Sequence, residues 1–134
     1  MELKPGLTGE ASMEVRVGNT AIEVGSGSVP VFATPMLVAI MENAAINAIT
    51  EHLPQGTSSV GTRVDCRHLA ATPIGMKVTA RAELVEVDRK RLLFKIEAFD
   101  EEEKVGEGQH ERFLIDLEKF LGRGEEKKQR FEAR

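Results

Sequence analysis

The sequence predicts an α+β fold in which a curved antiparallel sheet wraps around one long helix. Two observations lead to this prediction. The only strongly helical stretch, residues 34–53, is apolar over most of its circumference, so it must be enclosed rather than laid on a surface. After it come several alternating runs of apolar and polar residues joined by short turns, which favours antiparallel strands. One helix followed by a run of strands is typical of the α+β class.

Length and composition indicate a single domain. The chain has 134 residues, and the 41% that are hydrophobic suffice for a core. We expect this domain to cover residues 1–121. Residues 122–134 are mostly charged, so we expect a tail that is frayed or only weakly helical.

Charge and hydropathy exclude several classes of protein. A net charge of −4 and an aromatic content of 4%, without Trp or Tyr, argue against binding to nucleic acid. No segment approaches the roughly 20 consecutive apolar residues that a membrane span requires. The first nine residues lack the order of a signal peptide. The single cysteine, Cys66, cannot form an internal disulfide, which is compatible with the cytoplasmic location that we expect.

The residues before the helix are the least regular part of the chain. Residues 13–17 alternate as a strand does, and residues 21–24 can form another short strand. The flexible Gly-Ser stretch 25–28 follows. It is either a simple connection or a mobile lid over a cleft, and we favour the connection.

The helix is predicted to begin at Thr34-Pro35. Threonine is a favoured N-cap residue, and proline is tolerated at the first helical position because its missing N–H needs no partner there. The helix is expected to reach about Leu53, ahead of Pro54 and Gly56.

Glu42 is the residue of this helix that most needs an explanation. At about 100° per residue, the helix places it among apolar side chains, namely Val38, Ala39, Ala45, Ile46, Ile49 and Leu53. An unpaired charge in apolar surroundings costs several kcal/mol or takes up a proton, so a fold keeps one only where it is paired or used. Glu42 is therefore a functional carboxylate, or its side chain reaches the surface, or it forms a buried ion pair with one of the arginines.

Four long strands are expected after the helix, at residues 59–70, 76–87, 92–98 and 105–115. In the second strand the residues expected to point inward change from even-numbered to odd-numbered positions between Leu84 and Val85. This change indicates a β-bulge. The basic run 89–91 lies where the second and third strands turn. We favour a solvated hairpin tip there over a contact to a ligand phosphate.

The first of these strands places a histidine on the face that we expect to point inward. That face carries Thr62, Val64, Cys66 and His68. A single inward histidine is more often a satisfied core residue than a catalytic one. A thiol nucleophile or a metal site is not favoured at Cys66, because His52 and His110 lack the spacing that would complete a ligand set.

This order of elements is that of the hotdog fold. One curved sheet with exposed edges and a single helix leaves apolar surface uncovered, so two copies are expected to pair into a continuous sheet. We therefore expect a homodimer or a dimer of dimers.

Several sequence blocks also carry a family resemblance. They are Thr34-Pro35-Met36, Glu42-Asn43-Ala44-Ala45, Val60-Gly61-Thr62 and the run from Arg67 to Gly75. Together they resemble the hotdog thioesterases of the fluoroacetyl-CoA thioesterase-like family, over roughly residues 5–120. The resemblance implies an enzyme that hydrolyses a small acyl-CoA thioester to a free acid and CoA. It implies no cofactor, since CoA is part of the substrate, and no metal.

The resemblance also implies the site residues. Thr34, Glu42 and His68 match the catalytic residues of the family, and Gly61 matches a glycine that lines the acyl site. Glu42 would act as nucleophile or as general base for water, and His68 would orient it and move a proton.

Two details concern the substrate. Free N–H groups in the first helical turn, such as those of Met36 and Leu37, would stabilise the oxyanion of a reacting thioester. Gly25 and Ser28 stand where the fluoroacetyl-specific member has aromatic residues, so its acyl preference is not implied here.

Two other functions fit the same fold. A non-catalytic acyl-CoA-binding or structural hotdog dimer would keep Glu42 merely ion-paired and would show no turnover. A hydratase or dehydratase needs an acid–base histidine near the β-carbon of its substrate, and no histidine precedes His52. The hydratase is the least favoured of the three.

Overall fold

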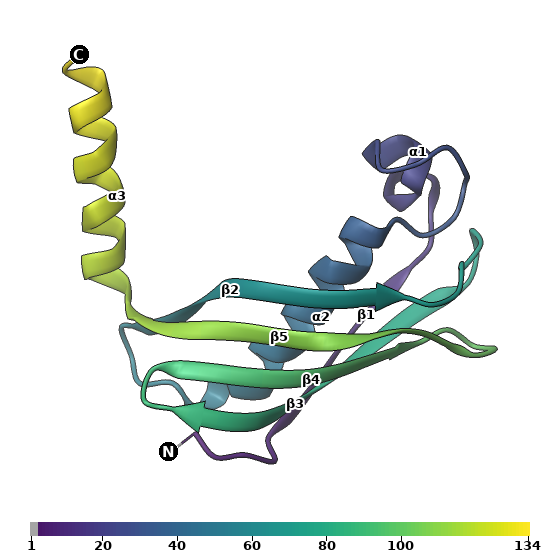
Figure 1. Cartoon of the computed structure of the whole chain (residues 1–134), viewed down its shortest axis with the longest axis horizontal. Coiled ribbons are helices and arrows are strands. Elements are labelled where there is room, and N and C mark those ends of the chain that lie inside the picture. The colour runs from purple at the N-terminus through teal and green to yellow at the C-terminus, as the bar shows by residue number, and fades with distance from the viewer. Residues whose placement is uncertain (1–2) are drawn as a thin grey trace.

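The computed structural model describes residues 3–134 and shows a curled five-stranded sheet with one long helix along its concave face (Figure 1). The strands are β1 (Thr8–Glu14), β2 (Thr57–His68), β3 (Lys77–Asp88), β4 (Arg91–Phe99) and β5 (Lys104–Asp116), and the central helix is α2 (Thr34–Ile49). All neighbouring strands are antiparallel, in the order β1-β3-β4-β5-β2. The predicted α+β hotdog architecture is confirmed. No helix within residues 3–134 is long and apolar enough to cross a membrane.

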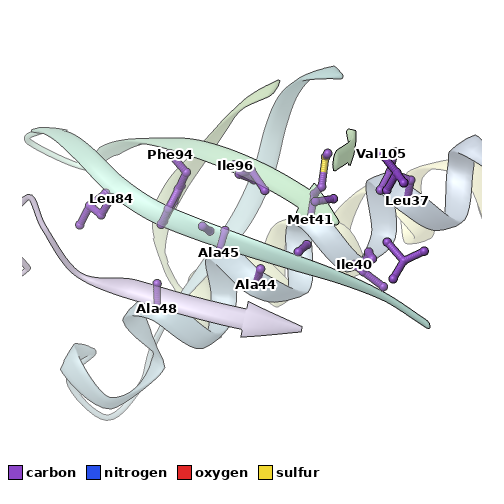
Figure 2. Close-up of a cluster of buried hydrophobic side chains, with 14 of the residues drawn as sticks. Leu37, Ile40, Met41, Ala44, Ala45, Ala48, Leu84, Phe94, Ile96 and Val105 are labelled. Atoms are coloured by element: carbon purple, nitrogen blue, oxygen red, sulfur yellow. The ribbon is translucent and has the colours of Figure 1, made fainter. Parts of the chain in front are cut away.

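The core lies between α2 and the sheet. Figure 2 shows side chains of the helix pointing toward Leu84, Phe94 and Ile96 on the strands. The helix contributes Leu37, Ile40, Met41, Ala44, Ala45, Ala48 and Ile49, all buried. As the alternation predicts, the inward side chains of β4 are buried as well, from Leu92 to Ala98. Full burial stabilises the fold by about 1.5–3 kcal/mol for each large apolar side chain.

Strand β1 passes so close to α2 that a glycine is required at one point. A Cβ on Gly9 would lie 2.3 Å from the backbone nitrogen of Ala48 and 2.4 Å from the carbonyl oxygen of Ala44. Backbone atoms cannot move aside as a flexible side chain does. The close approach lets the short strand cover the small residues of the helix.

Gly9→Ala is therefore expected to lower the free energy of unfolding by about 3 kcal/mol, at the upper end of the usual range for overpacking. Urea titration followed by circular dichroism measures this change. Gly18→Ala is the matched control, because a Cβ there would meet nothing within 4 Å. Equal stability of the two variants would contradict the close packing of β1 on α2.

Helix α2 begins one residue earlier than a threonine cap requires. Its N-cap is Ala33, so Thr34 is the first helical residue and its side chain caps nothing. The prediction that Thr34 is the N-cap was wrong, and the hydroxyl is free for another partner. A 3-10 turn (Thr50–His52) follows α2 and brings the chain to the predicted end near Leu53.

Three irregularities shift the register of the sheet, one of them between Ala98 and Phe99 where β4 pairs with β5. The predicted one is confirmed, because the pairing of β3 with β4 shifts between Leu84 and Glu86. A second shift, between Gly61 and Arg63 of β2, was not predicted. It turns Thr62 to the outer face of the sheet, where its hydroxyl donates to the Glu111 carboxylate at 2.8 Å. The prediction of an inward Thr62 was therefore wrong.

The segment before α2 differs most from expectation. Strand β1 lies at residues 8–14 rather than 13–17, and residues 21–24 form the one-turn helix α1 (Ala21–Val24) instead of a strand. Tertiary hydrogen bonds fix this segment, such as that from the Ala21 N–H to the Val31 carbonyl at 2.8 Å. Such contacts leave no periodic pattern in the sequence.

The chain ends in a regular helix, α3 (Leu117–Glu132), where we expected a frayed or weakly helical tail over residues 122–134. Asp116 is its N-cap and accepts a hydrogen bond from the Lys119 N–H at 3.1 Å. The boundary that we placed after residue 121 therefore falls inside α3.

Candidate active site

The first residue of α2 and the last residue of β2 meet at one end of the sheet. Thr34 Oγ1 lies 2.7 Å from His68 Nδ1. Burial lowers the pKa of the His68 imidazole below its ordinary value, so the ring is neutral at pH 7. Within residues 3–134 the other ring nitrogen, Nε2, is buried without a hydrogen-bond partner. A buried polar atom of this kind requires a partner, which a water molecule or a ligand can supply.

A cavity of about 350 Å³ adjoins this pair. Its walls include Thr34, His68, Phe32, Val29 and Leu69, together with Ala21, Val31, Ala70 and Ala71. Ser26 and Gly27 from the Gly-Ser stretch also line it. We favoured a simple connection for that stretch, and the structure shows that it is also a wall of the cavity.

Glu42 lies two helical turns further along α2, in a second polar cluster. Its Oε2 is 3.6 Å from Nη1 of Arg112 on β5. The Arg112 side chain, only 6% exposed, donates to the Ser59 hydroxyl at 2.8 Å and to the Ser59 carbonyl at 3.0 Å. These bonds hold the guanidinium in a fixed position against the carboxylate.

His110 completes the second cluster. Its Nε2 lies 3.0 Å from Arg112 Nη1, and its Nδ1 lies 2.8 Å from the Arg63 carbonyl. Because arginine can only donate, Nε2 is the acceptor and Nδ1 carries the proton. Burial lowers the pKa of His110, which agrees with a neutral ring. Arg63 follows the β2 bulge, so the bulge helps to place this network.

The Glu42 side chain is 38% exposed in the single chain. The prediction that apolar groups enclose it was wrong for the single chain. Both structural alternatives apply in part, because the side chain is partly exposed and also pairs with Arg112. The reason is that one sheet does not cover this flank of α2. Val38, Glu42 and Ile46, which follow one another at i+4 spacing, are all only half-buried.

Gly61 lies directly against the second cluster. It is paired with Arg112 in the register of β2 and β5. A Cβ at this position would lie 2.8 Å from Glu42 Oε2 and 3.1 Å from His110 Cε1. The absence of a side chain thus lets the strand approach the carboxylate.

Met36 and Leu37 do not offer the free donors that we expected. Both N–H groups donate to the Ala33 carbonyl at 3.0 Å. Pro35 has no N–H, so the remaining donor of the first turn is the Thr34 N–H, which has no acceptor within the described residues. It belongs to the same residue as the hydroxyl that contacts His68.

Sequence reasoning missed His110 and Arg112. They follow Gly106 and Gly108 at every second position of β5, so these four residues share one face of the strand. At Gly106 a Cβ would lie 2.9 Å from Leu37 Cδ2, which shows how closely the helix packs there. Two glycines and then two polar residues on a core-facing strand are a recognisable signal of a tight helix contact beside a polar site.

A curled antiparallel sheet around one long helix is the hotdog architecture, and solved thioesterases share it. A family model described as fluoroacetyl-CoA-specific thioesterase (FlK) matches residues 15–118, well over half of the chain. The chain therefore belongs to the FlK family, which is a family of thioester hydrolases.

Individual relatives agree with this assignment. The fluoroacetyl-CoA thioesterase of Streptantibioticus cattleyicolor is 44% identical over 90 residues, which are 67% of this chain and 65% of that protein. A solved structure of FlK is similar with a TM-score of 0.88 at 33% identity, over 95% of this chain and 98% of the other. A Thermus thermophilus protein described as a thioesterase superfamily member has a TM-score of 0.92 at 27% identity, over 99% and 98% of the two chains.

Proposed function

We propose that the protein is an acyl-CoA thioesterase that hydrolyses a small acyl-CoA to the free acid and CoA, with Thr34, Glu42 and His68 as its catalytic residues. The observation that supports this most directly is the Thr34–His68 hydrogen bond beside the cavity, with Nε2 of the histidine left unpaired. Family membership supports the same reaction. One relative was crystallised with fluoroacetate and CoA.

A homodimer explains how Glu42 reaches the Thr34–His68 pair. Eight residues of helix separate Glu42 from Thr34, about 12 Å by the rise per residue. Strand β2 lies at the edge of the sheet and has a free side. When two copies pair antiparallel through β2, the His68 end of one strand comes beside the Gly61 half of the other. Each site would then take Thr34 and His68 from one copy and Glu42 from the second.

The chemistry follows from these groups. The Glu42 carboxylate attacks the thioester carbonyl, or it removes a proton from a water molecule that attacks. Arg112 fixes the orientation of the carboxylate. The oxyanion that forms is stabilised by the Thr34 N–H at the positive end of α2. His68 holds the hydroxyl in place through Nδ1, and its Nε2–H donates a hydrogen bond to the departing CoA thiolate. In the general-base route the thiolate takes up the proton that Glu42 removed from the attacking water; in the covalent route water then hydrolyses the mixed anhydride formed on Glu42 and supplies that proton.

The experiment is free-thiol release from a panel of short, branched and aromatic acyl-CoAs. Hydrolysis of at least one of them at enzymatic rates is expected. Fluoroacetyl-CoA belongs in the panel as one member among others, because Ser26 and Gly27 in the cavity wall are small and leave room for larger acyl groups.

One observation favours a second candidate, a non-catalytic acyl-CoA-binding dimer. The Glu42–Arg112 ion pair satisfies the carboxylate without any substrate. This candidate predicts that calorimetry detects acyl-CoA binding while no member of the panel releases thiol. That result would overturn the proposed enzyme.

A further inference from the structure

Helix α3 carries an apolar face that is largely exposed in the single chain. Leu117, Phe120, Leu121 and Phe131 are 42%, 43%, 61% and 73% exposed. Their spacing places them on one side of the helix at about 100° per residue. Glu126 lies on the opposite side.

Such a helix is marginal in water on its own. Isolated helices shorter than roughly 12–15 residues are unstable even in favourable sequences. At 16 residues α3 is barely longer, and it contains Gly122 and Gly124, each of which costs about 1 kcal/mol relative to alanine. A regular α3 therefore needs a surface to pack on.

The position of α3 indicates where that surface lies. The helix follows Asp116, which pairs with Thr57 at the beginning of β2. Figure 1 shows α3 rising from the end of β5 past the edge strand β2 and away from the sheet. This is the side on which a second copy would pair through β2.

A second exposed apolar set lies at the other end of β2, around the cavity. Ile22, Val29, Leu69 and Ile74 are 48–51% exposed. Val29 and Leu69 line the cavity itself, next to His68. We call these four residues the cavity rim.

Antiparallel pairing through β2 brings these two surfaces together. The beginning of β2, where α3 starts, then lies beside the end of the second copy's β2, where the cavity rim starts. Strands are about 4.8 Å apart, whereas α3 is about 24 Å long by its rise per residue, so it spans the distance. The contact occurs twice about the two-fold axis, as a closed symmetric interface requires.

On the basis of the proposed dimer, we propose that α3 of each copy packs its apolar face on the cavity rim of the other copy. The helix then forms the outer wall of the cavity beside Thr34 and His68. It stabilises the dimer and limits the length of the acyl group that the cavity accepts.

The test is amide hydrogen exchange over residues 117–132 of the full-length protein. In the parent these amides are expected to be protected. Leu69→Gln on the rim is expected to speed their exchange at least tenfold, as is the double variant Leu121→Gln/Phe131→Gln on α3. Leu69→Gln is the more decisive of the two variants, because under the proposal Leu69 contacts α3 of the other copy and not α3 of its own chain.

Two matched controls accompany these variants. Glu126→Gln changes the opposite face of α3, and Phe99→Gln changes an exposed apolar residue on the outer face of β4; both are expected to leave the exchange unaltered. Exchange in the parent at the rate of an unfolded peptide would overturn the proposal. So would protection that Leu69→Gln leaves intact, or protection that appears only with phospholipid vesicles.

The exchange readout is independent of catalysis. If no acyl-CoA is hydrolysed but Leu69→Gln still exposes α3, the enzyme proposal fails and the α3 interface stands. If thiol is released while sedimentation shows a monomer, the α3 interface fails and hydrolysis stands. In an active dimer, the α3 double variant is also expected to raise the rate with long acyl-CoAs relative to short ones.

Discussion

Glu42→Gln is expected to lower kcat/KM for the best acyl-CoA by roughly 10²–10⁴-fold, the usual contribution of a general base or acid. Glutamine keeps the size of the side chain, and its amide oxygen can still accept from Arg112. It removes the negative charge and the proton-accepting oxygen that either mechanism requires. The measurement is thiol release under kcat/KM conditions, alongside thermal melting and sedimentation of the same preparation.

The control is Glu51→Gln, which removes an exposed carboxylate just beyond the end of α2. It changes the net charge by the same amount and is expected to keep full activity. A folded, dimeric Glu42→Gln protein with the activity of the parent would remove Glu42 from the mechanism. It would leave the ion pair with Arg112 as the only role of that residue.

The parts of the fold that could be predicted are those in which periodicity and burial agree. Strand β4 alternates strictly, and each predicted inward residue from Leu92 to Ala98 is buried. Helix α2 is long and apolar, so composition and periodicity alone predict both that it forms and that the sheet encloses it. Even the β3 bulge was predictable, because one extra residue in a strand changes the parity of its inward side chains, as happens after Leu84.

The parts that could not be predicted depend on contacts between distant residues. The β2 bulge follows Gly61, whose missing side chain makes room for Glu42 and His110, and neither is near it in sequence. Helical periodicity could indicate that Glu42 needs a partner, but could not select Arg112 from the other arginines. For α3 the local signal was present in the Asp116 cap, but a mostly charged composition concealed it.

The same distinction applies to the candidate site. Thr34, Glu42, His68 and Gly61 were suggested by residue type and family resemblance, and the structure pairs Thr34 with His68. It places Glu42 in a separate cluster with Gly61. In the proposed dimer these two clusters would meet across a two-fold axis. The pattern of one chain cannot predict such a meeting, because it carries no information on which residues of two separate copies lie side by side. Oligomeric assembly is therefore where the sequence is least informative about this site.

His68→Ala is expected to lower kcat by about 10²-fold or more while lowering the free energy of unfolding by only about 1 kcal/mol, the typical net value of one hydrogen bond. The variant removes the partner of the Thr34 hydroxyl and the unpaired Nε2 beside the cavity. His68→Gln is the informative companion, because it can still bond Thr34 but cannot carry a proton at neutral pH. We expect it to restore stability and not turnover.

The pH profile separates this role from a packing role. Burial lowers the pKa of His68 from its ordinary value of 6.5, so the neutral ring that accepts from Thr34 persists at pH 7. We expect kcat/KM to be level above neutral pH and to fall only below pH 6.5, where protonation places a positive charge on the buried ring and turns Nδ1 from an acceptor of the Thr34 hydroxyl into a donor to it. The unfolded chain binds the proton more readily, so stability also decreases as the pH falls below 6.5. In His68→Ala the decrease below pH 6.5 that this ring causes should disappear from both the kcat/KM profile and the stability profile. An unchanged kcat/KM profile together with a large loss of stability would show that His68 is a packing residue of the core and not a catalytic one.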